Sequence, residues 1–259
     1  MNNDNIYNIF SVKDKIVLIT GSSRGIGYKL AEGFAKAGSI VIINSKNKEN
    51  LKKAIDNLTK YNNKIFSCCF DINDKQKAKE SVDHIESKIG KIDILINNAG
   101  IHRRALLEEM TEEQWNEVIQ TNLNSVYYIS KIVAQYMIER KKGKIINITS
   151  LNAEAARPGI ANYCAAKGGL KMLTKAMAVE WGKYNINVNA IGPGYFITEL
   201  TKELKNNEEF NNWVISNIPL KRWGEVDDLI GTAIFLASEA SNYIQGQTIY
   251  VDGGWLAGL

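Results

Sequence analysis

Short apolar segments and amphipathic segments alternate along almost the whole chain, and this alternation constrains the fold more than any other sequence feature. Apolar segments rich in β-branched residues predict strands at residues 15–20, 40–44, 64–70, 92–97, 144–149, 187–191 and 247–251. Helices are predicted between them at residues 24–37, 48–61, 74–89, 111–140 and 162–183. About seven strands alternating with helices predict an α/β fold, in which a doubly wound parallel sheet carries helices on both faces.

The length and composition of the chain are those of one globular domain. Its 259 residues, 45% hydrophobic and 23% charged, are enough to bury a sizeable core. Neither a repeat nor a linker interrupts the alternation, so we predict a single domain over residues 1–259. The main irregular stretch is residues 192–223, with Pro193 and Pro219. Segments of that length inside a compact domain are usually functional, so we predict a substrate loop or lid there.

Charge, cysteine and histidine patterns argue against several classes of protein. The net charge of +4 comes from lysines and arginines scattered over predicted helices, which is typical of solvated helix faces and not of a nucleic-acid site. Of the three cysteines, Cys68 and Cys69 are adjacent in a predicted strand and would point to opposite sides. We therefore expect free thiols in a reducing compartment. Neither His84 nor His102 has a Cys or His at ligand spacing, so no metal site is predicted.

No targeting segment is evident in the sequence. Residues 1–10 are polar and rich in asparagine, and they lack the basic start and apolar run of a signal peptide. No stretch approaches the roughly 18 apolar residues that a membrane span needs. We expect a cytoplasmic protein with no membrane partner and no nucleic-acid partner.

A glycine-rich loop at residues 20–27 separates the first predicted strand from the first predicted helix. Gly21, Gly25 and Gly27 have the spacing G-x-x-x-G-x-G, and glycine lets a backbone turn tightly and approach a pyrophosphate. The free N–H groups at the start of the helix favour the negative charge of such a group. An ordinary tight turn is the alternative, but the position in a strand–helix series favours a dinucleotide site.

The end of the second predicted strand bears on the choice between NADP(H) and NAD(H). An acidic residue there accepts a hydrogen bond from the ribose 2′-hydroxyl of NAD(H) and repels a 2′-phosphate. This chain has Asn44-Ser45-Lys46 and no acid. Because Ser45 can donate to a phosphate and Lys46 can neutralise it, the sequence favours NADP(H). Alternatively, Lys46 is a surface lysine that opens a helix.

Tyr163 and Lys167 lie four residues apart on a predicted helix and therefore share a face. A free tyrosine, with a pKa near 10, is a poor base at neutral pH. A nearby ammonium and a positive nicotinamide ring favour the tyrosinate, so we expect Lys167 to lower the pKa of Tyr163. Tyr163 would then exchange a proton with the substrate oxygen. Ser150, which follows a predicted strand, would hold that oxygen.

Together these motifs carry a resemblance. The glycine loop is followed in order by Asn97-Asn98-Ala99-Gly100, Asn122, Ser150, Tyr163-x-x-x-Lys167 and Pro193-Gly194. In this order the sequence resembles the short-chain dehydrogenase/reductase family over residues 10–259. The resemblance implies a single Rossmann-type domain, an NAD(P)-dependent enzyme acting on CH–OH donors, and a homotetramer with residues 251–255 near a subunit contact.

The same resemblance implies roles for individual residues. Ser150, Tyr163 and Lys167 would be catalytic, and Asn122 would hold a water molecule in a proton relay that reaches Lys167. The residues implied to bind the cofactor are Gly21, Ser23, Arg24, Gly25, Ile26, Gly27, Ser45, Lys46, Asp71, Ile72, Asn98, Ala99, Gly100, Tyr163, Lys167, Pro193, Gly194 and Ile197. Each also has a structural interpretation, for example Asp71 as a helix cap or Asn97 in a turn. Their joint occurrence in family order favours the enzyme.

Two further segments point to the substrate. Residues 100–104, Gly-Ile-His-Arg-Arg, and residues 222–224, Arg-Trp-Gly, resemble family members that act on gluconate or 2-deoxygluconate, and residues 194–202 resemble the gluconate members more. An arginine can bind a sugar-acid carboxylate through two parallel N–H bonds. The predicted substrate contacts are Arg103, Arg104, Ser150, Asn152, Tyr163 and Tyr195, with His102 a lesser candidate. Alternatively, the two arginines pair with Glu108 and Glu109 or lie at a subunit contact.

Two other functions are compatible with these motifs. A 3-oxoacyl-thioester reductase would share Ser150, Tyr163 and Lys167, but a fatty-acyl chain gives Arg103 and Arg104 no carboxylate to bind. A non-catalytic dinucleotide-binding regulator would have no need for the three catalytic residues together. The sequence therefore favours an oxidoreductase that transfers hydride between NADP(H) and a sugar acid.

Overall fold

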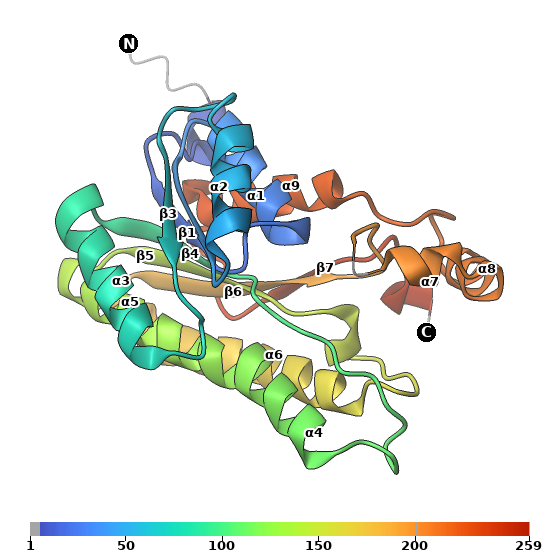
Figure 1. The fold of residues 1–259 in the computed structure, drawn as a ribbon. Coiled ribbons are helices and arrows are strands. Elements are labelled where there is room, and N and C mark those ends of the chain that lie inside the picture. The colour runs from blue at the N-terminus through green and yellow to red at the C-terminus, as the bar shows by residue number, and fades with distance from the viewer. Residues whose placement is uncertain (1–5, 200, 259) are drawn as a thin grey trace.

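Seven strands form one parallel sheet in a computed structural model of the chain, which describes residues 6–199 and 201–258 (Figure 1). The strand order is β3-β2-β1-β4-β5-β6-β7, the Rossmann-type arrangement, and it confirms the predicted fold class. The strands are β1 (Ile16–Ile19), β2 (Ile40–Ser45), β3 (Ile65–Cys69), β4 (Ile92–Asn97), β5 (Gly143–Ile148), β6 (Ile186–Pro193) and β7 (Thr248–Val251). Residues 1–5 of the polar N-terminal segment, and Leu200 of the run 194–202, lie outside the described residues.

Helices cover both faces of the sheet. On one face lie α1, α2 and α9, and on the other lie α3, α4, α5 and α6, while α7 and α8 project from the body (Figure 1). Their bounds are α1 (Gly25–Lys36), α2 (Lys48–Leu58), α3 (Lys75–His84), α4 (Glu112–Ile119), α5 (Ser125–Arg140), α6 (Ala161–Trp181), α7 (Lys202–Asn206), α8 (Glu208–Asn217) and α9 (Ile230–Ala237). None of the described helices is long and apolar enough to cross a membrane.

The side chains of a strand point alternately to the two faces, so a sheet covered on both sides needs continuous apolar strands. In β1, Val17 and Ile19 pack in one core cluster with Phe34 of α1. Leu18 points to the other face and belongs to a second cluster with Val133 of α5. All four β1 side chains are buried, which explains why its sequence is apolar throughout.

The structure corrects the expectation of one long helix over residues 111–140. The segment consists of α4 and α5 joined by a π-helical turn, Gln120–Asn124. Such a turn widens the helix by one residue and often marks a functional site. Here it contains the buried Asn122, whose side chain binds the backbone of Ile101 instead of facing solvent.

The stretch 192–223, expected to be an irregular loop or lid, contains α7 and α8. Its polar residues 205–212 end α7 and begin α8, where the Asn207 side chain accepts a hydrogen bond from the backbone N–H of Phe210. The apolar side of this segment forms a third core cluster, in which Val214, Trp223 and Trp255 are buried. Helix α9 had not been predicted either; its sequence is apolar on nearly every side and lacks a clear period.

Candidate active site

The glycine loop between β1 and α1 is packed so tightly that side chains would not fit at two of its positions. A Cβ on Gly21 would lie 2.7 Å from the Ala99 Cα, and Gly21 has a positive φ of +61°. A Cβ on Gly27 would lie 2.4 Å from the Asn98 Nδ2 and 2.6 Å from the Gly21 carbonyl oxygen. The glycines are therefore required by the approach of the β4 end to the loop.

Gly25 differs, because its surroundings are open. Its φ is +59°, yet no atom lies within 4 Å of the position that a Cβ would take. Arg24, at the N-cap of α1, makes no side-chain hydrogen bond to the first helical turn. The start of α1 is therefore open beside Gly25, and the helix dipole there favours a negative charge such as that of a pyrophosphate. Ser23 and Ile26 lie in the same loop.

Asn98 and Ala99 fasten this loop to the end of β4. The Asn98 side-chain amide donates to the carbonyl oxygens of Thr20 and Gly21 at 2.9 and 3.0 Å. The backbone N–H groups of Asn98 and Ala99 donate to the Thr20 hydroxyl at 3.0 and 3.1 Å. Asn98 and Ala99 therefore hold the glycine loop in position. The sequence had predicted only that they lie beside the ribose of the cofactor.

The residues expected to contact the adenosine part of the cofactor lie at the ends of β2 and β3. Lys46 Nζ is 3.6 Å from Asp71 Oδ2, which joins two residues predicted to contact different parts of the cofactor. The Ser45 hydroxyl accepts a hydrogen bond from the Asn47 N–H at 3.2 Å. Asp74, not Asp71, caps the following helix, so the capping interpretation of Asp71 is wrong. Lys46 is strongly exposed, and a ligand phosphate can reach it.

Ser150, Tyr163 and Lys167 meet beyond the end of β5. Lys167 Nζ donates to the Ile148 carbonyl at 2.7 Å and lies 5.6 Å from the centroid of the Tyr163 ring. The Ser150 hydroxyl forms a hydrogen bond with Tyr163. Ser150 follows β5, whereas the other two residues come from α6, so the register of α6 against the sheet sets this arrangement.

Burial controls the protonation of this cluster. It raises the pKa of Tyr163 to about 12, although the hydrogen bond from Ser150 opposes the shift. It also lowers the pKa of Lys167 to about 8. In the protein by itself the pKa of Tyr163 is thus raised by loss of solvation, whereas the expected lowering depended on Lys167 together with a positive nicotinamide ring. The protein's own residues favour a protonated phenol, which is the form that donates a proton.

Asn122 connects this cluster to the chain that leaves β4. Its Oδ1 accepts from the Ile101 N–H at 2.8 Å, and its Nδ2 donates to the Ile101 carbonyl at 2.9 Å. A side chain that satisfies both backbone groups of one residue fixes the path of the chain there. Asn122 thereby positions His102, the next residue.

The imidazole ring of His102 stacks on the ring of Tyr163. The ring centroids of His102 and Tyr163 are 3.8 Å apart, with an interplanar angle of 23°. Burial, with the charges of Arg104, Lys167 and Arg157, lowers the pKa of His102 to about 4, so the imidazole is neutral at physiological pH. Its Nδ1 is buried and has no hydrogen-bond partner among the residues that the structure describes. The sequence had indicated only a minor role for this residue.

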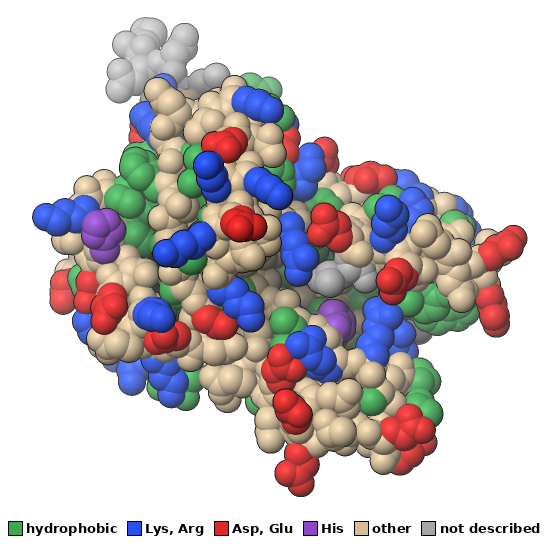
Figure 2. Space-filling view, in the orientation of Figure 1, with side chains coloured by type: hydrophobic (Ala, Val, Ile, Leu, Met, Phe, Trp, Pro, Cys, Tyr) green, Lys and Arg blue, Asp and Glu red, His purple; other side chains and the backbone are tan. Residues whose placement is uncertain are grey.

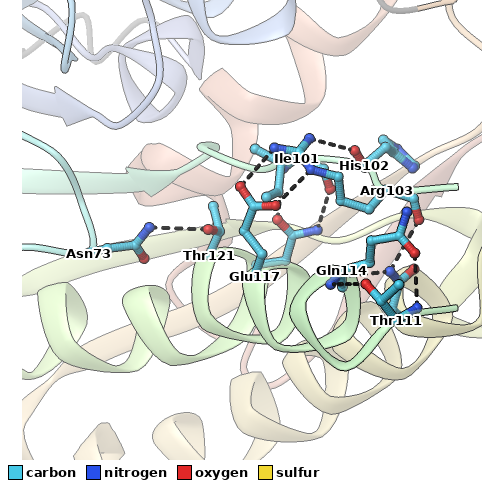
Figure 3. A network of polar contacts seen from close by, with 10 residues as sticks. Asn73, Ile101, His102, Arg103, Thr111, Gln114, Glu117 and Thr121 are labelled. Carbon is cyan, nitrogen blue, oxygen red and sulfur yellow. Dashed lines mark hydrogen bonds and ion pairs between the residues drawn. The ribbon is translucent and has the colours of Figure 1, made fainter.

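The adjacent residues Arg103 and Arg104 differ in their ion-pair contacts. Arg103 binds Glu117 of α4 through two hydrogen bonds of 2.7 Å and also donates to the His102 carbonyl (Figure 3). Its guanidinium is thus engaged by Glu117, so the predicted contact with substrate would compete with this ion pair, and its partner is neither Glu108 nor Glu109. Within the described residues Arg104 forms no ion pair.

The remaining substrate candidates, Tyr195 and Asn152, lie in the segments that follow β6 and β5. Tyr195 follows β6, and its ring centroid is 4.9 Å from that of Trp255 and 5.6 Å from that of Trp223. Asn152 donates to the Ala155 carbonyl at 2.9 Å, so part of its side chain stabilises the loop after β5. Trp255 is buried in this aromatic cluster, which places it in the core of the chain.

Pro193, Gly194 and Ile197 lead the chain from β6 into the α7–α8 segment. The Gly194 N–H donates to the Val251 carbonyl at 3.0 Å, and a Cβ on Gly194 would lie 2.7 Å from the Asp252 Cα. The Ile197 N–H donates to the Gly224 carbonyl at 3.0 Å. These contacts join the start of the segment to its end and to the C-terminal residues.

Comparison with known proteins decides the family. The sequence model described as enoyl-(acyl carrier protein) reductase matches residues 21–256. Gluconate 5-dehydrogenase of Gluconobacter oxydans is 46% identical over 95% of this chain and 96% of its own length. The chain belongs to the short-chain dehydrogenase/reductase family. As a member, it is an NAD(P)-dependent oxidoreductase, which confirms the predicted enzyme class.

Other short-chain dehydrogenases/reductases are similarly close. The 5-keto-D-gluconate 5-reductase of Escherichia coli K12 is 44% identical over 97% of this chain and 99% of its own. A crystal structure of gluconate 5-dehydrogenase from Burkholderia cenocepacia, in complex with NADP and tartrate, has 42% identity and a TM-score of 0.94, covering 97% of this chain and 99% of that chain. The likeness thus covers the glycine loop, the catalytic cluster and the α7–α8 segment together.

Proposed function

We propose that this short-chain dehydrogenase/reductase interconverts D-gluconate and 5-keto-D-gluconate with NADP(H). The observation that carries the proposal is an arginine, Arg104, with no ion-pair partner among the described residues, two positions from the imidazole that stacks on Tyr163. A carboxylate is the partner that such a guanidinium favours. The names of the relatives at 44–46% identity, and the tartrate in the Burkholderia complex, support an acid as the ligand.

In this proposal Tyr163 exchanges the proton. During reduction its phenol donates a proton to the carbonyl oxygen, and Ser150 donates a hydrogen bond to the same oxygen. When bound, the nicotinamide supplies or accepts the hydride, and its positive oxidised form favours the tyrosinate. Lys167, held by the Ile148 carbonyl, returns a proton towards Tyr163, and Asn122 holds the water molecule that serves Lys167.

The cofactor is proposed to lie along the carboxyl ends of the strands. The loop at residues 21–27 takes the pyrophosphate, and Asp71 and Ile72 contact the adenine. Ser45 and Lys46 take a 2′-phosphate, in exchange for the Lys46–Asp71 contact. Asn98, Ala99 and Gly100 line the ribose side, while Pro193, Gly194 and Ile197 contact the nicotinamide. Three structural relatives were crystallised with NADP, which supports NADP(H) over NAD(H).

The substrate is proposed to lie between this cofactor and the α7–α8 segment. Arg104 binds the carboxylate, and Tyr195 contacts hydroxyl groups together with Asn152, whose Oδ1 accepts a hydrogen bond from the Ser150 hydroxyl at 3.4 Å. Residues 192–223 act as the substrate lid. The protein is proposed to be a cytoplasmic homotetramer, like the family members that its C-terminal residues resemble.

Two other substrates deserve testing because relatives carry their names. The 2-dehydro-3-deoxy-D-gluconate 5-dehydrogenase of Formosa agariphila is 44% identical, and a 3-oxoacyl-(acyl carrier protein) reductase of Thermotoga maritima is 38% identical. The first is also a sugar acid and would use Arg104 in the same way. The second has no carboxylate at the corresponding place, so Arg104 argues against it. A non-catalytic regulator is disfavoured by the intact cluster of Ser150, Tyr163 and Lys167.

The test is a spectrophotometric panel that crosses NADH and NADPH with keto-gluconates, deoxy-keto-sugar acids and an acetoacetyl thioester. We expect the fastest turnover with 5-keto-D-gluconate and NADPH. Tyr163→Phe should lower turnover at least about a hundredfold, the scale for removing an acid/base group. A strong preference for NADH would contradict the role of Ser45 and Lys46. Undiminished turnover by Tyr163→Phe would contradict the mechanism.

A further inference from the structure

Two loops that are far apart in the sequence are joined next to the proposed carboxylate site. One follows β4 and carries Arg104, and the other precedes α6 and carries Arg157. The Ala105 N–H donates to the Gly159 carbonyl at 3.3 Å. The side chain of Asn162 donates to the Arg103 carbonyl at 3.1 Å. The backbone bond between Ala105 and Gly159 lies one residue from Arg104 and two from Arg157, so it brings the two arginines near each other.

Arg157 is held in place from two sides. Its guanidinium carbon lies 5.5 Å from the centroid of the Phe210 ring of α8, a cation–π contact. Its backbone N–H forms a hydrogen bond with the thiol of Cys164, the residue after Tyr163. The side chain is half-buried between the catalytic helix and the α7–α8 segment. Figure 2 shows Lys and Arg side chains bordering the hollow on the face from which α7 and α8 project.

The two guanidinium groups lie close enough to affect one another. Burial and then the positive charge of Arg157 lower the pKa of Arg104, whereas Glu203, exposed on α7, opposes the shift. Both arginines also act on His102, which stacks on Tyr163. The positive charges therefore converge on the side of the site where the substrate would lie.

Apart from Arg104 and Arg157, every arginine of the chain has an acidic partner. The sequence contains six arginines. Four of them form ion pairs, Arg24 with Glu199, Arg103 with Glu117, Arg140 with Glu86 and Arg222 with Asp228. Within residues 6–199 and 201–258, the two without an ion pair are Arg104 and Arg157, which lie together. Two partly desolvated like charges repel each other, and an anion between them removes the repulsion.

We propose that Arg157 is a second carboxylate-binding residue, which with Arg104 clamps the acid group of the substrate. The inference rests on the proposed sugar-acid activity and adds a specificity determinant to it. One guanidinium can bind both carboxylate oxygens, and a second one makes the site select an acid over its neutral analogue. Phe210 positions Arg157, so the clamp is complete only when α8 packs against the loop at residues 154–160.

The test compares an acid with its amide in variants of Arg157. The substrates are 5-keto-D-gluconate and 5-keto-D-gluconamide, which differ in the charged group that the clamp would bind. Arg157→Gln should lower kcat/KM for the acid at least about tenfold, mainly through KM, and change that for the amide by less than about twofold. Arg157→Lys, which keeps the charge but loses the planar fork, should recover part of the loss.

Lys183→Gln provides the matched control, because Lys183 also lies over an aromatic ring, 5.1 Å from the Tyr184 centroid, but on the exposed surface. It should leave the acid-to-amide ratio unchanged. Unaltered NADPH affinity and melting temperature in Arg157→Gln would show that the variant is folded. If that variant does not fold, Arg157→Lys alone decides by its acid-to-amide ratio.

The outcomes separate this inference from the proposed function. If the wild type reduces 5-keto-D-gluconate but Arg157→Gln keeps the acid-to-amide ratio, the clamp is overturned and the proposed function stands. If the wild type reduces no keto-gluconate, the proposed function fails. Calorimetric binding of D-gluconate to the NADPH complex then decides the clamp. Weaker binding by Arg157→Gln than by the wild type supports it, and equal or absent binding overturns it.

Discussion

The two sides of the site are built in different ways. On the proposed cofactor side, residues 20–27 pack closely against residues 98–99, where the Asn98 amide and the Thr20 hydroxyl bond to backbone groups, and a Cβ on Gly21 or Gly27 would collide with its neighbours. The proposed substrate side consists of large rings: Tyr195, Phe210, Trp213, Trp223 and Trp255 pack around one another, with the Tyr195 centroid 4.9–6.2 Å from the others. A backbone cradle suits a ligand common to a whole family. A wall of side chains can be changed residue by residue for each substrate.

The largest loss of stability is expected from a substitution in the aromatic cluster on the proposed substrate side. Trp223 is 4% exposed and donates from its Nε1 to Asn211 at 2.8 Å. Trp223→Ala should cost about 3–5 kcal/mol of unfolding free energy, or release the α7–α8 segment alone, because it leaves a large cavity. Chemical denaturation and limited proteolysis within residues 196–222 measure the two. Tyr243→Ala, at a fully exposed ring, should change stability by less than about 0.5 kcal/mol.

A smaller loss of stability is expected from a substitution in the glycine loop on the proposed cofactor side. Gly27→Ala places a methyl group against the Asn98 amide and the Gly21 carbonyl, so about 1–3 kcal/mol of stability should be lost, together with NADPH affinity. Gly231 of α9 is the matched helical glycine, because nothing lies within 4 Å of its absent Cβ. Gly231→Ala should instead stabilise by about 0.5–1 kcal/mol. Equal effects of the two substitutions would contradict the conclusion that close neighbours of Gly27 leave no room for a side chain.

Lys167, where the two sides meet, should make stability depend on pH. Burial lowers its pKa to about 8 from 10.5, so between these values the unfolded chain binds more protons than the folded one. Stability should therefore rise from pH 8 towards 10, by up to about 1.4 kcal/mol per pH unit from this group. Above pH 10 the raised pKa of Tyr163 reverses the trend. Urea denaturation of the wild type and Lys167→Met across this range measures the difference, and parallel curves would refute the prediction.

The smallest effect, a change in cofactor preference, should come from a substitution at the exposed edge of the proposed cofactor side. Lys46→Ala removes a charge that is 3.6 Å from Asp71 and leaves that carboxylate facing the proposed 2′-phosphate site. The preference for NADPH over NADH should fall by about fivefold, the scale of one exposed ion pair. Fluorescence titration with both cofactors measures the ratio. Lys52→Ala, on the exposed face of α2, is a charge-matched control and should leave the ratio unchanged.

The sequence predicted the parts of this protein that depend on short-range patterns. Apolar runs located all seven strands within a few residues, because central strands such as β1 are buried on both faces and must be apolar. The edge strand β3 is largely exposed beyond Ile65. The Tyr163–Lys167 spacing placed both side chains on one side of α6, since helical geometry brings residues four apart together. The π-helical turn at Gln120–Asn124 could not be foreseen, because nothing in the local pattern reveals that Asn122 binds Ile101.

Only the tertiary structure decided what neighbouring residues of the same type do. Arg103 and Arg104 are identical and adjacent, yet one is bound by Glu117 and the other lies beside Arg157. Propensity and periodicity act over a few residues, whereas these partners come from α4 and from the loop before α6. The sequence by itself determined the sheet, the glycine loop and the catalytic spacing. The packing of distant segments determined which charges remain unpaired, because a charge is neutralised only by groups that the fold brings within a few ångströms.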